Sequence, residues 1–169
     1  MPLHSELLKQ AAALANSDES EAASRRAASS AYYALFHFLT SDAVERMVPP
    51  TPVPLRLQDR RAFTHAGMRD VCKEFAKGIP GSLHPSTRGL ISPPIDPDLA
   101  AVAENFVALQ EARHKADYDL GFKTTQLWAL EKIGRAEVAF NCWNNVRSTP
   151  NASVFLVALA LQRHWQRSS

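Results

Sequence analysis

Residues 17–47 read SDESEAASRRAASSAYYALFHFLTSDAVERM, a stretch that contains neither glycine nor proline. Asp18, with Glu21 three residues later, matches a capping box, which marks the start of a helix. Four apolar residues follow at steps of four, three and four and so share one helix face: Ala28, Tyr32, Leu35 and Leu39. The stretch therefore predicts one long helix with a core-facing stripe.

Further helices are expected on both sides of this stretch. Apolar residues at helical spacing predict them over residues 3–16, 56–76, 97–118 and 124–146, with an apolar helix after Pro150. Asp96 and Pro97 suit the cap and the first position of the 97–118 helix. No useful length of sequence alternates apolar and polar residues, so strands are not expected. The chain is predicted to be all-α, an antiparallel bundle of about five helices plus a C-terminal apolar helix.

The prolines are concentrated in the middle of the chain, where nine of the eleven lie between Pro49 and Pro97. Proline breaks helices, so 48–54 and 78–95 are predicted to be two proline-rich loops. A loop as long as 78–95 is usually a lid, a binding loop, a partner-contact arm or disordered. The 169 residues are predicted to form one domain, 1–169, with a core over roughly 3–146. Residues 147–169 would form a terminal helix that is buried or contacts a partner.

Composition excludes several classes of protein. Apolar residues make up 46% and charged residues 21%, as in an ordinary soluble domain, and the net charge of +2 excludes a strongly basic coat protein. Two cysteines, Cys72 and Cys142, are too few for a disulfide framework or a zinc site, and no metal ion or cofactor is expected. The N-terminus lacks a secretory signal pattern and the apolar run 152–161 is too short to cross a bilayer, which predicts a cytoplasmic protein without membrane contact.

Two segments carry polar side chains in suggestive patterns. In the long helix, steps of four, three and four place four residues on one face: Arg26, Ser30, Tyr33 and His37. This face is either ordinary solvent-exposed surface or a hydrogen-bonding strip that binds a phosphate or a base, or joins two helices. At the end of the 97–118 helix, Arg113, His114 and Lys115 suit the negative end of the helix dipole, and two carboxylates and a tyrosine follow them.

These two segments, RRAASSAYYALFH at 25–37 and EARHKADYD at 111–119, resemble the HEPN superfamily of small prokaryotic all-α domains. The resemblance covers roughly residues 3–146. It implies a homodimer that acts as a nucleotide- or RNA-binding or accessory module, through a polar groove around Arg26 and Arg113. It also implies a protein partner, an antitoxin or a nucleotidyltransferase-like protein. The nucleotide-binding residues would be Arg26, Ser30, Tyr33, His37, Lys115 and Tyr118.

Two alternatives remain. Active members of the family resemble metal-independent ribonucleases, toxins or defence effectors, that use an arginine and, four to six residues later, a histidine. Here the catalytic candidates are Arg113, Asp117 and His65: Asp117 stands where the histidine is expected, and His65 follows Arg60 at the family spacing. The second alternative is a structural bundle that binds a partner through residues 78–95 and 154–161.

Overall fold

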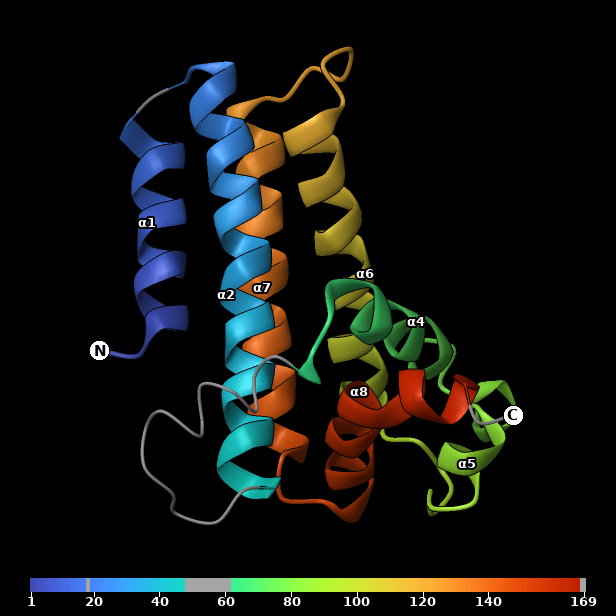
Figure 1. Ribbon diagram of the computed structural model, residues 1–169. Helices are drawn as coiled ribbons and strands as arrows, with labels where there is room; N and C mark the ends of the chain where they lie inside the picture. Colours follow the sequence, from blue (N-terminus) through green and yellow to red (C-terminus); the bar gives the residue numbers. More distant parts are fainter. Residues whose placement is uncertain (18, 48–61, 168–169) are drawn as a thin grey trace. The chain divides into compact units, whose positions relative to one another are not determined.

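The computed structural model describes residues 1–17, 19–47 and 62–167, and this part of the chain is helical and contains no strand (Figure 1). The all-α prediction is confirmed. The α-helices are α1 (Leu3–Ser17), α2 (Glu21–Met47), α4 (His65–Phe75), α5 (Pro85–Arg88), α6 (Pro97–Tyr118), α7 (Gln126–Val146) and α8 (Pro150–Arg167), with one 3₁₀ turn, η2 (Pro80–Ser82). None of the helices in the described ranges is long and apolar enough to cross a membrane.

The chain packs into two compact units. Unit 1 consists of Met1–Phe38 and Asn105–Asn141, and unit 2 consists of Leu39–Glu104 and Cys142–Ser169. Helices α2, α6 and α7 each contribute residues to both units.

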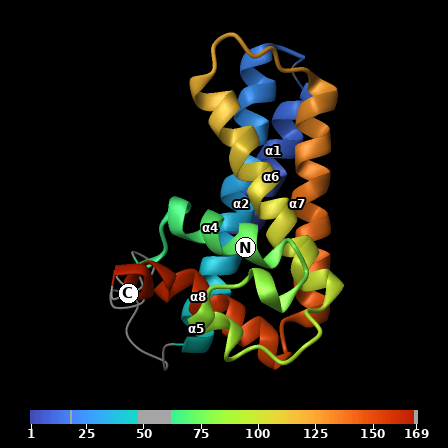
Figure 2. The ribbon, with the colours of Figure 1, turned by 90° about the vertical axis from the view of Figure 1, so that its right-hand side faces the viewer.

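Unit 1 is a four-helix arrangement of α1 with parts of α2, α6 and α7, in which the chain direction alternates (Figures 1 and 2). Its core is rich in alanine, because small side chains on facing helices allow the backbones to approach closely. The predicted core residue Tyr32 is fully buried, and its ring lies 5.6 Å from that of Phe106. Other fully buried residues of this core are Ala11, Ala15, Ala27, Ala28, Ala31, Leu35, Leu109 and Ala136.

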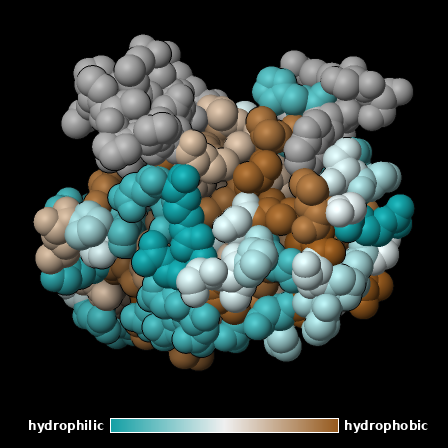
Figure 3. Space-filling view, turned by 90° about the horizontal axis from the view of Figure 1, so that it is seen from below, coloured by the Kyte–Doolittle hydropathy of each residue, from teal (hydrophilic) through white to brown (hydrophobic). Residues whose placement is uncertain are grey.

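Unit 2 has a core of larger side chains. Trp143 is fully buried, with its ring 6.0 Å from that of Phe155, which in turn lies 4.9 Å from Phe75. The apolar residues of α8, among them Phe155 and Leu156, are therefore part of this core. On the face seen from below, hydrophobic side chains (brown) lie interspersed among hydrophilic ones (teal) (Figure 3).

The structure corrects the predicted start of the third helix. The prediction placed it at Arg56, whereas α4 begins at His65 and the residues just before it, 62–64, are not α-helical. Thr64 has an extended backbone, and its Oγ1 accepts a hydrogen bond from the backbone N–H of Gly67 at 3.1 Å, which makes it the N-cap. Residues 48–61, with the predicted loop 48–54 and Arg60, lie outside the described residues.

The segment 78–95 is more ordered than a loop. It contains η2 and α5, and four of its side chains are buried: Leu83, Thr87, Ile91 and Ile95. Its backbone is held by side chains from helices of unit 2. Glu74 accepts from the N–H of His84 at 2.8 Å, and Asn151 bonds both the N–H and the C=O of Ser92, at 2.9 and 2.7 Å. The segment is thus not disordered, because its apolar residues belong to the core. A role as a lid, a binding loop or a partner-contact arm stays a prediction.

Two glycines are expected to respond in opposite ways to alanine. Gly78 has a φ of +67°, which strains any residue with a Cβ, whereas an added Cβ at Gly134 inside α7 would meet no atom within 4 Å. We expect Gly78→Ala to lower the free energy of unfolding by about 1 kcal/mol. Gly134→Ala should raise it by up to about 1 kcal/mol, because alanine is the better helix former. Urea unfolding followed by circular dichroism measures both, and shifts of the same sign would contradict the assignment.

Candidate functional site

A concentration of polar and aromatic side chains lies where the last turns of α6 meet α2 in unit 1. It consists of five residues, called here the Arg113 cluster: Ser29 and Tyr33 from α2, and Arg113, Asp117 and Tyr118 from α6. On α6, Asp117 stands four residues after Arg113 and so lies one turn further along the same face, and Tyr118 follows it directly.

The guanidinium of Arg113 is the centre of the cluster. Its Nη2 donates to the hydroxyl of Tyr33 at 3.0 Å, and its Nε lies 2.8 Å from Oδ2 of Asp117. The second contact is an ion pair without a directed hydrogen bond, since the Nε–H has no acceptor in line. The guanidinium carbon also lies 5.4 Å from the ring centre of Tyr33 and 5.6 Å from that of Tyr118, within cation–π range of both.

These neighbours keep Arg113 charged. Partial burial acts to lower the pKa of the guanidinium, but Tyr33 and Tyr118, which are ionised only at the high pH at which arginine titrates, raise it together with the carboxylate of Asp117 and the hydrogen bond to Tyr33. The pKa ends above its ordinary value. Asp117 is itself held from the side of α2, where the buried Ser29 donates to its Oδ1 at 2.5 Å. The guanidinium of Arg113 is thus charged and fixed in place, and its charge is paired with the carboxylate of Asp117.

Aromatic rings extend the cluster in two directions. The ring of Tyr33 stacks on that of His37 with 6.4 Å between centroids and 28° between planes. The ring of Tyr118 lies 5.2 Å from that of His114, and Tyr118 is 63% exposed. Tyr118 therefore places an aromatic surface in solvent next to a cation.

A second arginine, Arg25, holds the end of α6 in place. Its Nη1 donates to the carbonyl oxygens of Ala116 at 2.7 Å and Asp119 at 3.0 Å, and its Nη2 donates to those of Asp119 and Phe122. Glu21, one turn earlier on α2, orients the guanidinium: its Oε1 lies 2.8 Å from Nη2 of Arg25. Arg25 thus binds the carbonyl of Ala116 in the last turn of α6 and those of two residues that follow the helix. Its charge lies at the negative end of the α6 dipole.

The structure brings four of the predicted site residues into one cluster: Tyr33, Arg113, Asp117 and Tyr118, with His37 next to them. Arg26 and Ser30 lie on α2 and have no described contact with the cluster. Lys115 lies on a different face of α6, with its Nζ 5.5 Å from the ring centre of Phe122. His65 is the first residue of α4 and belongs to unit 2, whereas the cluster belongs to unit 1.

Sequence reasoning missed Ser29 and Arg25 as partners of α6. Both stand at steps of four from Tyr33 along α2, so the stripe 25/29/33 shares Tyr33 with the predicted stripe 26/30/33/37. Each stripe is a valid face of one helix. The charge pattern offers one signal: Glu21 lies four residues before Arg25, and such a pair orients an arginine along the helix surface.

Among the described residues, no group of three or more histidine, cysteine, aspartate or glutamate side chains is placed to hold a metal ion. No protein-family model matches the chain, and no curated protein or solved structure matches it either.

Proposed function

We propose that the protein binds single-stranded RNA, or a nucleotide from it, through the Arg113 cluster. The observation that carries the proposal is the exposed ring of Tyr118 above the guanidinium of Arg113. An arginine that only joined α6 to α2 would need Tyr33 and Asp117 as partners. It would not need an aromatic residue such as Tyr118, which is 63% exposed to solvent.

The two groups suit the two parts of a nucleotide. An exposed aromatic ring stacks on a base of any sequence, because every base has a flat face. Arg113 uses Nε and Nη2 toward Asp117 and Tyr33, and its Nη1 group is in no hydrogen bond with the described residues. That group is available to a phosphate oxygen, and a hydrogen bond between charged groups is among the stronger ones in proteins.

The resemblance to HEPN domains points to the same place on the chain, since it is carried by the residues around Tyr33 and Arg113. The homodimer and the protein partner that it implies stay predictions, which the mass of the protein in solution would test. Cytoplasmic localisation also stays a prediction.

Tyr118→Ala is the sharpest test of the proposed binding. We expect fluorescence anisotropy with a labelled single-stranded RNA of about ten nucleotides to show about tenfold weaker binding, because one base–ring stack is lost. Tyr118→Phe should stay within about twofold of wild type, since stacking does not need the hydroxyl. Leu127→Ala, which truncates a side chain that is 77% exposed in the same unit, is the matched control and should bind as wild type does.

Equal affinity of wild type and Tyr118→Ala would contradict the proposal, as would the absence of binding at about 50 mM salt, where phosphate contacts are strongest. The same samples test the ribonuclease alternative by gel electrophoresis after long incubation. Intact RNA favours binding alone. Cleavage that is lost in Arg113→Ala and Asp117→Asn, or in His65→Ala, would favour the nuclease.

A further inference from the structure

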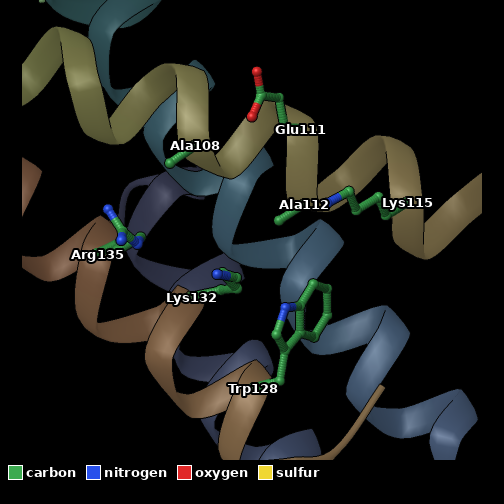
Figure 4. A pocket seen from close by; sticks show the side chains of 7 residues that line it. All are labelled: Ala108, Glu111, Ala112, Lys115, Trp128, Lys132 and Arg135. Carbon is green, nitrogen blue, oxygen red and sulfur yellow. The ribbon is translucent and has the colours of Figure 1, made fainter. Parts of the chain in front are cut away.

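Unit 1 contains a pocket of about 150 Å³ between α6 and α7 (Figure 4). Ala108 and Ala112 line it from α6, and Trp128, Lys132 and Arg135 line it from α7. The hollow exists because the two alanines are one helical turn apart and are too small to fill the space opposite the longer side chains of α7. None of these residues belongs to the Arg113 cluster.

Two ammonium groups are held in place at this pocket by aromatic rings. Lys132 Nζ lies 5.3 Å from the ring centre of Trp128, and Lys115 Nζ lies 5.5 Å from that of Phe122. The rings of Phe122 and Trp128 contact each other edge to face, with centroids 5.4 Å apart. The two rings therefore position two cations before any ligand arrives, which lowers the entropy cost of binding an anion.

A third cation, Arg135, is also fixed in orientation. Its Nε donates to Glu131, which Lys132 also contacts, and its Nη1 donates to Oδ1 of Asn105 at 3.2 Å. Its Nη2 group is in no hydrogen bond with the described residues, so it can bind a ligand. Lys132 and Arg135 thus share Glu131 as their ion-pair partner. The carboxylate of Glu111, which also lines the pocket, is turned away from the hollow (Figure 4).

We propose that this pocket binds a phosphate group. Three cationic side chains on two helices, all of them hydrogen-bond donors, suit a tetrahedral dianion, which accepts hydrogen bonds from several directions at once. The pocket, with a volume of about 150 Å³, has room for one phosphate group. The phosphate is either inorganic or the terminal group of a larger molecule that lies outside the pocket.

Phosphate binding can be followed at the indole N–H signal of Trp128 in a ¹H–¹⁵N NMR spectrum, assigned with Trp128→Phe. Inorganic phosphate is expected to shift this signal in a saturable way, and sodium chloride of equal ionic strength is not. Adenosine 5′-monophosphate is the second probe: tighter binding than inorganic phosphate identifies a terminal phosphate as the ligand, and weaker binding identifies the free ion.

Two variants test the pocket by charge and by space. Lys115→Gln should weaken phosphate binding about tenfold, and Ala108→Leu, which fills the hollow without changing a charge, should abolish the shift. Lys9→Gln, at an exposed position of α1, is the matched control and should behave as wild type. Tyr118→Ala should also leave the phosphate titration unchanged, which separates this site from the RNA-binding proposal. An unchanged titration in both Lys115→Gln and Ala108→Leu, or no saturable shift in wild type, would overturn the inference.

Discussion

Arg25→Ala is expected to lower the free energy of unfolding by about 3 kcal/mol, because it removes a group of charge-assisted hydrogen bonds at a helix end. The side chain is 16% exposed and donates to carbonyl oxygens of four residues: Lys115, Ala116, Asp119 and Phe122. Without it, the carbonyls of Ala116, Asp119 and Phe122 lose this donor, whereas that of Lys115 keeps the backbone N–H of Asp119. The end of α6 also loses one of its connections to α2. Urea unfolding followed by circular dichroism measures the change.

The neighbouring arginine is the matched control. Arg26→Ala removes the same charge from the same helix at an exposed position, and a change below about 0.5 kcal/mol is expected. Arg25→Lys should fall between the two, because lysine keeps the charge and loses the planar fork that reaches several carbonyls. Equal destabilisation by Arg25→Ala and Arg26→Ala would show that the α6 cap contributes nothing to stability. Since Tyr118 is the last residue of α6, Arg25→Ala should also weaken RNA binding.

Asp42→Ala is expected to lower the free energy of unfolding by about 2 to 3 kcal/mol, because it removes hydrogen bonds and ion pairs inside unit 2. The carboxylate of Asp42 is 7% exposed, and it accepts from the indole N–H of Trp143 at 2.9 Å and from Arg147. Its Oδ2 also lies 3.2 Å from Nε of Arg46. Alanine would leave the N–H of the buried Trp143 without its acceptor. The two arginines are 27% and 46% exposed and regain water, so they add less to the loss.

Glu45→Ala is the control for Asp42→Ala, since Glu45 is an exposed carboxylate three residues further along α2. It should change the stability by less than about 0.5 kcal/mol. Asp42→Asn should cost less than alanine, because the amide oxygen remains as an acceptor for the indole N–H. Urea unfolding followed by circular dichroism measures these changes. If Asp42→Ala unfolds at the urea concentration of wild type, the network around Trp143 does not stabilise the fold.

Much of the fold follows from local signals in the sequence. Helices were predicted over 3–16 and 124–146 and are found at Leu3–Ser17 and Gln126–Val146. Asp96 acts as expected before α6: its Oδ1 accepts from the N–H of Asp98 at 2.8 Å. Such signals are reliable because capping and proline effects depend on a few neighbouring residues.

The sequence predictions were wrong where contacts between distant parts of the chain determine the structure. Leu83, Ile91 and Ile95 lie among prolines and glycines and look like loop residues, yet they are buried in unit 2. Asn151, about sixty residues away in the sequence, holds the backbone of this segment. No local sequence pattern indicates a partner so far away in the chain.

The sequence by itself determined that the protein is helical, and it determined which residues of α2 face a core, because Ala28, Tyr32, Leu35 and Leu39 recur at helical spacing and all four are buried. Only the tertiary structure decided which polar face of α2 meets α6. Tyr33 belongs to two stripes of α2, one through Arg25 and Ser29 and one through Arg26 and Ser30. These two pairs point about 100° apart around the helix axis, and helical spacing is compatible with both stripes. The packing of α6 against α2 selects the stripe of Arg25 and Ser29, because there the carbonyls at the end of α6 and the carboxylate of Asp117 find their donors.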